Sequence, residues 1–189
     1  NYNVAEHQQA IEEAVASHPD AAWKIVTMHQ DIYGTGLDHS DTDGMILRTQ
    51  LTPIFDANDI DVVLQGHDHT YSRSKLLYGD GQTHGTYEFS LTEDGTDYDW
   101  EHATNTQTGE KIELNPDESD ADAVAAKDAF QQDNLCYTIE DVEGNSVTDP
   151  EGILYLTANS ASGSKFYELI AQQQITSQRE ARTGCRATR

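Results

Sequence analysis

The sequence predicts an α/β protein organised around a pair of parallel strands. One apolar run spans 62–64 and stops at Gly66, and a second spans 22–28 and stops at His29. A helical pattern separates the two runs, and parallel strands require a crossover of this kind. Ligands of open α/β sheets bind beside the carboxyl ends of the strands, so the residues after each run are the first candidates for a site.

The first predicted helix spans 4–17, where apolar residues recur at helical spacing. The helix ends before His18-Pro19 because the residue preceding proline is pushed away from helical geometry. Both His7 and His18 are interpreted as exposed helix residues. The apolar strand at 22–28 follows.

The loop at 30–43 is rich in Gly, Asp, Thr and His, which is typical of a segment that lines a site. A helix is predicted at 44–58, and Pro53 is expected to kink or divide it. The unbroken apolar run at 62–64 indicates a strand that is buried on both faces.

Short strands are then predicted at 74–78, 87–91, 134–139 and 153–158. Residues 92–132 are mostly polar and acidic, so they are interpreted as a solvated excursion with one short helix at 121–130. A calcium loop in this excursion would need alternating oxygen ligands and a terminal glutamate, a pattern that is incomplete here. We assign 1–170 to one domain and 171–189 to a polar to basic tail or linker.

The chain is strongly acidic, with a formal net charge of −23. Four arginines lie in the last eleven positions, so residues 1–178 carry 7 basic and 33 acidic groups. Such a surface repels nucleic-acid phosphates and anionic membranes, which argues against both as partners. No apolar run approaches the ~18 residues of a transmembrane helix.

The chain begins at Asn1 rather than Met, which indicates a processed or trimmed product. Its two cysteines, Cys136 and Cys185, allow at most one disulfide and do not form a framework. Cys136 stands in an apolar run, where a buried free thiol is the usual state.

Three histidines follow the two apolar runs. His29 ends the first run, and His67 and His69 lie on the tight turn that Gly66 allows after the second. Neutral imidazole is a common metal ligand, and nearby carboxylates complete the composition of a divalent metal site. The carboxylates are Asp31 and Asp68. The alternative is a polar surface turn with solvated histidines, because short motifs match by chance.

Residues 66–73, Gly-His-Asp-His-Thr-Tyr-Ser-Arg, follow Trp-Lys-Ile-Val-Thr-Met-His at 23–29. Together these motifs resemble the C-terminal half of the calcineurin-like metallophosphoesterases, in particular the secreted bacterial enzymes of the purple acid phosphatase-like branch. The segment 152–167 is similar to the closing strand and loop of that branch. The resemblance covers about 4–78 and 152–169.

The resemblance implies a four-layer αββα sandwich with a mixed sheet, and metal-dependent hydrolysis of phosphate-ester small molecules. It implies two divalent or trivalent ions (Fe, Zn or Mn), with His29 and His67 on one ion and His69 on the other. His39 would contact the phosphate or protonate the leaving oxygen. Tyr71 and Arg73 would contact substrate. An extracellular or cell-surface location is also implied.

The family's N-terminal motifs, Asp-x-His, Gly-Asp and Gly-Asn-His-Glu, have no counterpart before the first matched histidine of this sequence. Two-metal sites need more ligands than three histidines supply. We therefore expect the missing N-terminal half of the same protein as a partner, and weak metal binding with little or no turnover from this chain alone. The alternatives are a non-catalytic acidic surface module and a calcium-binding module that retains the fold.

Overall fold

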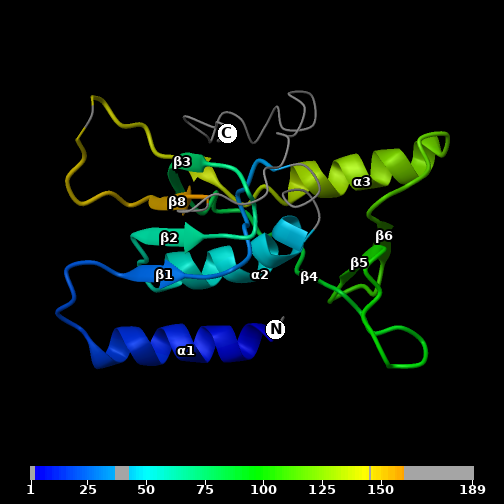
Figure 1. Cartoon of the computed structure of the whole chain (residues 1–189), viewed down its shortest axis with the longest axis horizontal. Helices are drawn as coiled ribbons and strands as arrows, with labels where there is room; N and C mark the ends of the chain where they lie inside the picture. The colour runs from blue at the N-terminus through cyan, green and yellow to red at the C-terminus, as the bar shows by residue number, and fades with distance from the viewer. Residues whose placement is uncertain (1–2, 37–42, 145, 160–189) are drawn as a thin grey trace.

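The computed structural model describes residues 3–36, 43–144 and 146–159, which form a mixed α/β fold (Figure 1). The helices are α1 (Val4–Ser17), α2 (Asp43–Ala57) and α3 (Ala121–Asp133). The strands are β1 (Ile25–Thr27), β2 (Val62–Gln65), β3 (Ser72–Tyr78), β4 (Tyr87–Glu88), β5 (His102–Asn105), β6 (Lys111–Glu113), β7 (Thr138–Ile139) and β8 (Ile153–Thr157). Residue His39, residue Cys185 and the predicted tail at 171–189 lie outside the described ranges.

The larger sheet is mixed and has the strand order β1-β2-β8-β3-β7. Strand β2 pairs in parallel with both β1 and β8, whereas β3 runs antiparallel to β8 and β7 runs antiparallel to β3. In this register Ile25 lies opposite Val62, which lies opposite Leu154. The parallel pair predicted from the two apolar runs is confirmed.

Helix α1 has the bounds that its periodicity predicts. The Asn3 side chain caps it by accepting a hydrogen bond from the Glu6 amide at 3.2 Å. Val4 and Ile11 pack against the core below the sheet, although none of the helix residues is fully buried. His18 is exposed as expected. The expectation for His7 is wrong: this side chain is half-buried, because it shares the inward face of the helix with Val4 and Ile11.

Helix α2 packs against two separate cores, which is why it is apolar on more than one face. Leu47, Leu51 and Phe55 join the core of the larger sheet. Met45 and Ile46 join a second core under the smaller sheet. The helix continues through Pro53 as one element, so the predicted division is not present.

The predicted solvated excursion at 92–132 contains two strands, β5 and β6, of a second sheet. Strands β4, β5 and β6 form an antiparallel sheet, and α3 packs on it (Figure 1). Its core residues are Met45, Ile46, Phe89, Ala103, Ile112, Leu114 and Phe130. Each of the two strands β5 and β6 contributes only one fully buried residue. Such sparse burial leaves no alternating pattern in the sequence, so the strands were not predicted.

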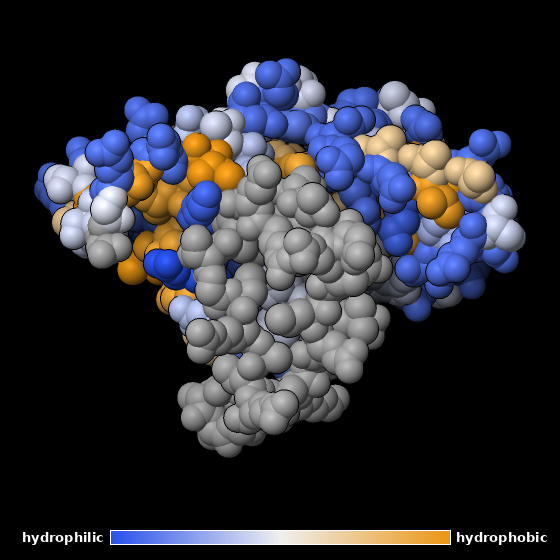
Figure 2. Space-filling model, turned by 90° about the horizontal axis from the view of Figure 1, so that it is seen from above, coloured by the Kyte–Doolittle hydropathy of each residue, from blue (hydrophilic) through white to orange (hydrophobic). Residues whose placement is uncertain are grey.

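One face of the larger sheet is open, which corrects the prediction that β2 is buried on both faces. Val63 is fully buried, but its neighbour Leu64 is 37% exposed and Ile25 of β1 is 56% exposed. Successive side chains of a strand point to opposite faces, so Leu64 and Ile25 belong to the uncovered side. Hydrophobic residues gather on the left of the face seen in Figure 2, the part of the molecule that holds the larger sheet in Figure 1.

Candidate metal centre

His29 and His67 meet at the carboxyl ends of two adjacent parallel strands. The ladder between β1 and β2 continues past both strands, because Met28 N donates to Leu64 O at 3.0 Å and Gly66 N donates to His29 O at 3.1 Å. Nε2 of His29 lies 3.3 Å from Nδ1 of His67, and the two rings meet edge-on with their centroids 5.2 Å apart. Either ring can donate in this contact. The structure therefore brings together two of the three predicted metal ligands.

The turn after β2 aims His67 at His29. His67 has a φ of 61°, a left-handed conformation in which histidine is found more often than most side chains. Gly66 precedes it, and a Cβ at Gly66 would lie only 3.2 Å from His29 O. Glycine at this position therefore lets the two strand ends approach closely.

Asp68 holds the loop that follows β1. Its carboxylate is buried and accepts hydrogen bonds from Thr35 N at 2.7 Å and Gly36 N at 2.6 Å. A Cβ at Gly36 would lie 2.0 Å from Asp68 Oδ1, a distance that no side chain tolerates. The carboxylate between the two histidines of the motif thus joins the β1 loop to the β2 loop.

Asp31 belongs to a buried network that crosses three strand ends. Its carboxylate accepts hydrogen bonds from Tyr33 N and from the Thr157 hydroxyl at the end of β8. Gln65 at the end of β2 donates to Thr157 Oγ1 at 3.3 Å and accepts from Ile32 N at 2.9 Å. The two carboxylates that the sequence placed near a metal are therefore both engaged in hydrogen bonds that position the loop carrying His29.

Three further predicted site residues lie after β2. His69 and Tyr71 are half-buried in and just after the turn between β2 and β3, and Arg73 is exposed on β3. His39 lies outside the described residues. Among the residues that the structure describes, no group of three or more His, Cys, Asp or Glu side chains is placed to hold a metal ion.

The spacing of the histidine pair is compatible with a shared ion as well as with a hydrogen bond between the rings. Two nitrogen ligands at about 2.0–2.1 Å from a tetrahedral ion lie about 3.3–3.4 Å apart. The two facing ring nitrogens are 3.3 Å apart. Imidazole donors suit zinc and iron, so the pair His29 and His67 could hold such an ion, provided that further ligands complete its shell.

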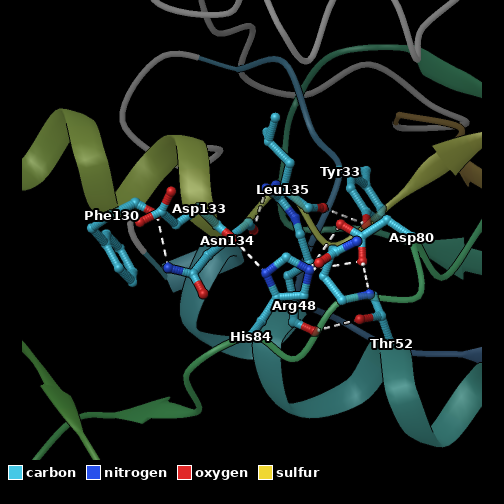
Figure 3. Close-up of polar contacts among 10 residues, drawn as sticks. Tyr33, Arg48, Thr52, Asp80, His84, Phe130, Asp133, Asn134 and Leu135 are labelled. Atoms are coloured by element: carbon cyan, nitrogen blue, oxygen red, sulfur yellow. Dashed lines mark hydrogen bonds and ion pairs between the residues drawn. The ribbon is translucent and has the colours of Figure 1, made fainter.

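Arg48 of α2 holds the loop that follows β1 (Figure 3). No pattern in the sequence indicated this role. Its side chain is fully buried and donates to Ile32 O from Nε at 2.9 Å and from Nη2 at 2.6 Å. The guanidinium also lies 4.4 Å from the centre of the Tyr33 ring, a cation–π contact. Burial raises the pKa of Tyr33 well above its ordinary value, although Arg48 acts in the opposite direction.

The residues just after α3 contact Arg48 and Tyr33. Tyr33 Oη donates to Leu135 O at 2.9 Å, and Arg48 Nη1 contacts Asn134 O at 3.5 Å. Nearby, His84 bridges Asp80 and the Asp133 carbonyl through its two ring nitrogens (Figure 3). The loop after β1 is therefore fixed by α2 and by the segment after α3, which are distant in sequence.

Comparison with known proteins gives two short matches. The chain is 39% identical over 57 residues to two uncharacterised proteins of Mycobacterium tuberculosis, one from strain CDC 1551 / Oshkosh and one from strain H37Rv. The match covers 30% of this chain and 11% of each relative, so the chain spans a small part of their length. No protein-family model matches the chain. Across the described ranges, none of the helices is long and apolar enough to cross a membrane.

Proposed function

We propose that this chain is the C-terminal half of a dinuclear metallophosphoesterase of the purple acid phosphatase-like branch, and that it contributes to the hydrolysis of phosphate esters. The observation that carries the proposal is the 3.3 Å approach of His29 and His67 at adjacent parallel strand ends. The parallel pairing of β1 and β2 brings these two residues together at the edge where α/β sheets bind ligands, which supports the proposal.

In this proposal His29 and His67 hold one ion and His69 holds the second. When bound, the two ions (Fe, Zn or Mn) would lower the pKa of a bound water towards ~7 and neutralise charge on the phosphoryl oxygens. Asp68 and Asp31 position the loop of His29 through their hydrogen bonds.

The substrate contacts are also part of the proposal. Arg73 is exposed on β3, and its guanidinium is suited to phosphate oxygens, which it can bind with two parallel hydrogen bonds. Tyr71 lies two residues before it in the chain, and His39 would protonate the leaving alcohol or contact the phosphate. A phosphate ester supplies an anion that matches these donors.

The open face of the larger sheet supports the sandwich architecture. Parallel sheets are normally covered on both faces, but Leu64 and Ile25 are exposed on the uncovered side. We propose that a second sheet from the N-terminal half packs on this face and brings the missing ligands with it. An extracellular or cell-surface setting remains part of the same proposal.

Hydrolysis of para-nitrophenyl phosphate tests the function. A protein that joins this chain to its N-terminal half should turn over substrate with Fe, Zn or Mn, and His67→Ala should abolish turnover. The 189-residue chain alone should show little or none. Turnover by the chain alone that His67→Ala abolishes would contradict the need for the second half.

The two alternatives give different results in the same experiments. Metal binding without turnover, even in the longer protein, would favour a non-catalytic module. Calcium binding that is insensitive to substitution of His29, His67 and His69 would favour a calcium-binding module.

A further inference from the structure

Three exposed hydrophobic side chains lie together in the connection between β4 and β5, in the part of the molecule that holds the smaller sheet (Figure 1). Leu91 is 58% exposed, Tyr98 is 38% exposed and Trp100 is 45% exposed. Leu91 pairs with Tyr98 in an antiparallel bridge, and the ring centroids of Tyr98 and Trp100 lie 5.4 Å apart. We call these three residues the aromatic patch. Large hydrophobic residues that gather at a surface mark interaction sites more often than single ones do.

A short hairpin fixes the backbone of the aromatic patch. Thr92 N donates to Asp97 O at 2.9 Å, and Asp99 N donates to Ser90 O at 2.8 Å. Both hydrogen bonds keep the register of the bridge within the patch. The Thr92 hydroxyl also donates to Asp94 Oδ1 at 2.6 Å, within the turn of the hairpin. The patch therefore lies on a defined strand pair rather than on an irregular loop.

The ring of Trp100 is supported from the interior. The register of the hairpin places Phe89 opposite Trp100, and the centroids of their rings lie 4.8 Å apart. Phe89 is buried in the core of the smaller sheet. Contacts with Phe89 and Tyr98 restrict the Trp100 side chain, so little conformational entropy is lost when a partner binds its exposed part.

The charge around the aromatic patch is negative. Residues 93–101 contain five carboxylates and neither lysine nor arginine. Asp99 pairs with Lys111 at 2.8 Å and with His102 at 2.9 Å. The other four carboxylates are exposed, and they belong to Glu93, Asp94, Asp97 and Glu101. A cation is attracted both by these carboxylates and by the faces of the aromatic rings, whereas an anion is repelled.

We propose that the aromatic patch binds a basic peptide segment of a partner protein, with an arginine side chain stacked on the exposed part of the Trp100 ring. Arginine suits this surface because its planar guanidinium both stacks on aromatic rings and pairs with carboxylates. Residues 1–178 carry 7 basic and 33 acidic groups, so the body of the chain attracts such a segment from a distance. This inference goes beyond the proposed function and does not depend on it.

Fluorescence anisotropy of a fluorescein-labelled peptide of alternating arginine and glycine, mixed with the full chain, tests the proposal. Trp100→Ala should weaken binding of this peptide about tenfold, because the cation–π contact is lost. Trp23→Ala is the matched control, since Trp23 is 64% exposed but precedes β1 of the larger sheet. This variant should bind the peptide as the unsubstituted chain does. A peptide with lysine in place of arginine has the same charge and should bind more weakly than the arginine peptide.

Removal of charge tests the electrostatic part of the proposal and leaves both rings in place. Glu93→Gln together with Glu101→Gln should weaken binding of the arginine peptide. Asp20→Asn together with Glu143→Gln removes the same charge from exposed positions outside the hairpin and should have a smaller effect. Circular dichroism should show that every variant folds.

Three results would overturn the proposal. They are no saturable binding of the arginine peptide, equal effects of Trp100→Ala and Trp23→Ala, and equal effects of the two pairs of charge substitutions. A different occupant is tested in the same assay by replacing with glutamine the four arginines of the chain's own basic segment, Arg179, Arg182, Arg186 and Arg189, which lie outside the described residues. The peptide should bind this variant as it binds the unsubstituted chain. A gain in affinity that Trp100→Ala removes would assign the patch to the chain's own segment instead of a partner.

Discussion

The carboxylate of Asp68 occupies the space that a side chain at residue 36 would need. Asp68 Oδ2 accepts a hydrogen bond from Gly36 N at 2.6 Å, and a Cβ on Gly36 would lie 2.0 Å from Asp68 Oδ1. These two residues join the loop after β1 to the turn after β2. The contact holds the two loops at the separation that lets His29 meet His67.

Removal of the Asp68 carboxylate should destabilise the fold. Asp68→Ala leaves the buried amides of Thr35 and Gly36 without their acceptor, so the free energy of unfolding should fall by about 3–5 kcal/mol. Urea denaturation measures this change. Asp68→Asn keeps one acceptor oxygen and should cost less. Glu13→Ala removes an exposed carboxylate of α1 and should change stability by less than about 1 kcal/mol.

A methyl group at residue 36 should be tolerated only when Asp68 is shortened. Gly36→Ala should lower the free energy of unfolding by about 1–3 kcal/mol, because the carboxylate must move. In the Asp68→Ala background the same substitution should cost much less. A double-mutant cycle by urea denaturation measures this coupling, and additive effects would show that the two residues do not compete for space.

Arg48 should matter far more than a surface arginine. Arg48→Met leaves the carbonyl of Ile32 without two donors, so unfolding should become easier by about 2–4 kcal/mol. The exposed Arg73→Met should change stability by less than about 0.5 kcal/mol. Thermal or urea unfolding compares the two variants, and equal effects would refute the role of Arg48 as an anchor.

Cys136 should react slowly with thiol reagents. Burial raises the pKa of its thiol to about 11, and the thiolate is the reactive form. In a Cys185→Ser background at about pH 8, only about one thiol in a thousand is then ionised, and labelling should quicken about tenfold per pH unit. Iodoacetamide labelling followed by mass spectrometry measures the rate. Rapid labelling of the folded protein at that pH would contradict the burial.

Some features of the fold could be predicted because their signals are local. Helix α1 has the predicted bounds 4–17. The helical spacing of apolar residues begins at Val4, and His18-Pro19 marks the end of the helix. The parallel pairing of β1 and β2 followed from two apolar runs separated by a helix. Because the two histidines follow the ends of these paired strands, the pairing also placed His29 beside His67.

Other features depend on contacts between distant residues and leave no local pattern. Asp68 accepts hydrogen bonds from amides 32 and 33 positions away, so the sequence showed a carboxylate near the histidines but not that it joins two loops. Arg48 contacts Ile32, which lies 16 residues away in the chain, and Asn134, which lies 86 residues away. The inward position of His7 was missed because a polar residue on an amphipathic helix is ordinarily assigned to the exposed face.

Titration of the 189-residue chain with Co²⁺, followed by visible absorption, tests the central claim most directly. The account predicts weak binding with the spectrum of histidine-bound cobalt, lost in His29→Ala and in His67→Ala. His18→Ala, which removes an exposed histidine of the chain far from the pair, should bind as the unsubstituted chain does. Cobalt binding that survives both His29→Ala and His67→Ala would contradict a metal centre at these strand ends.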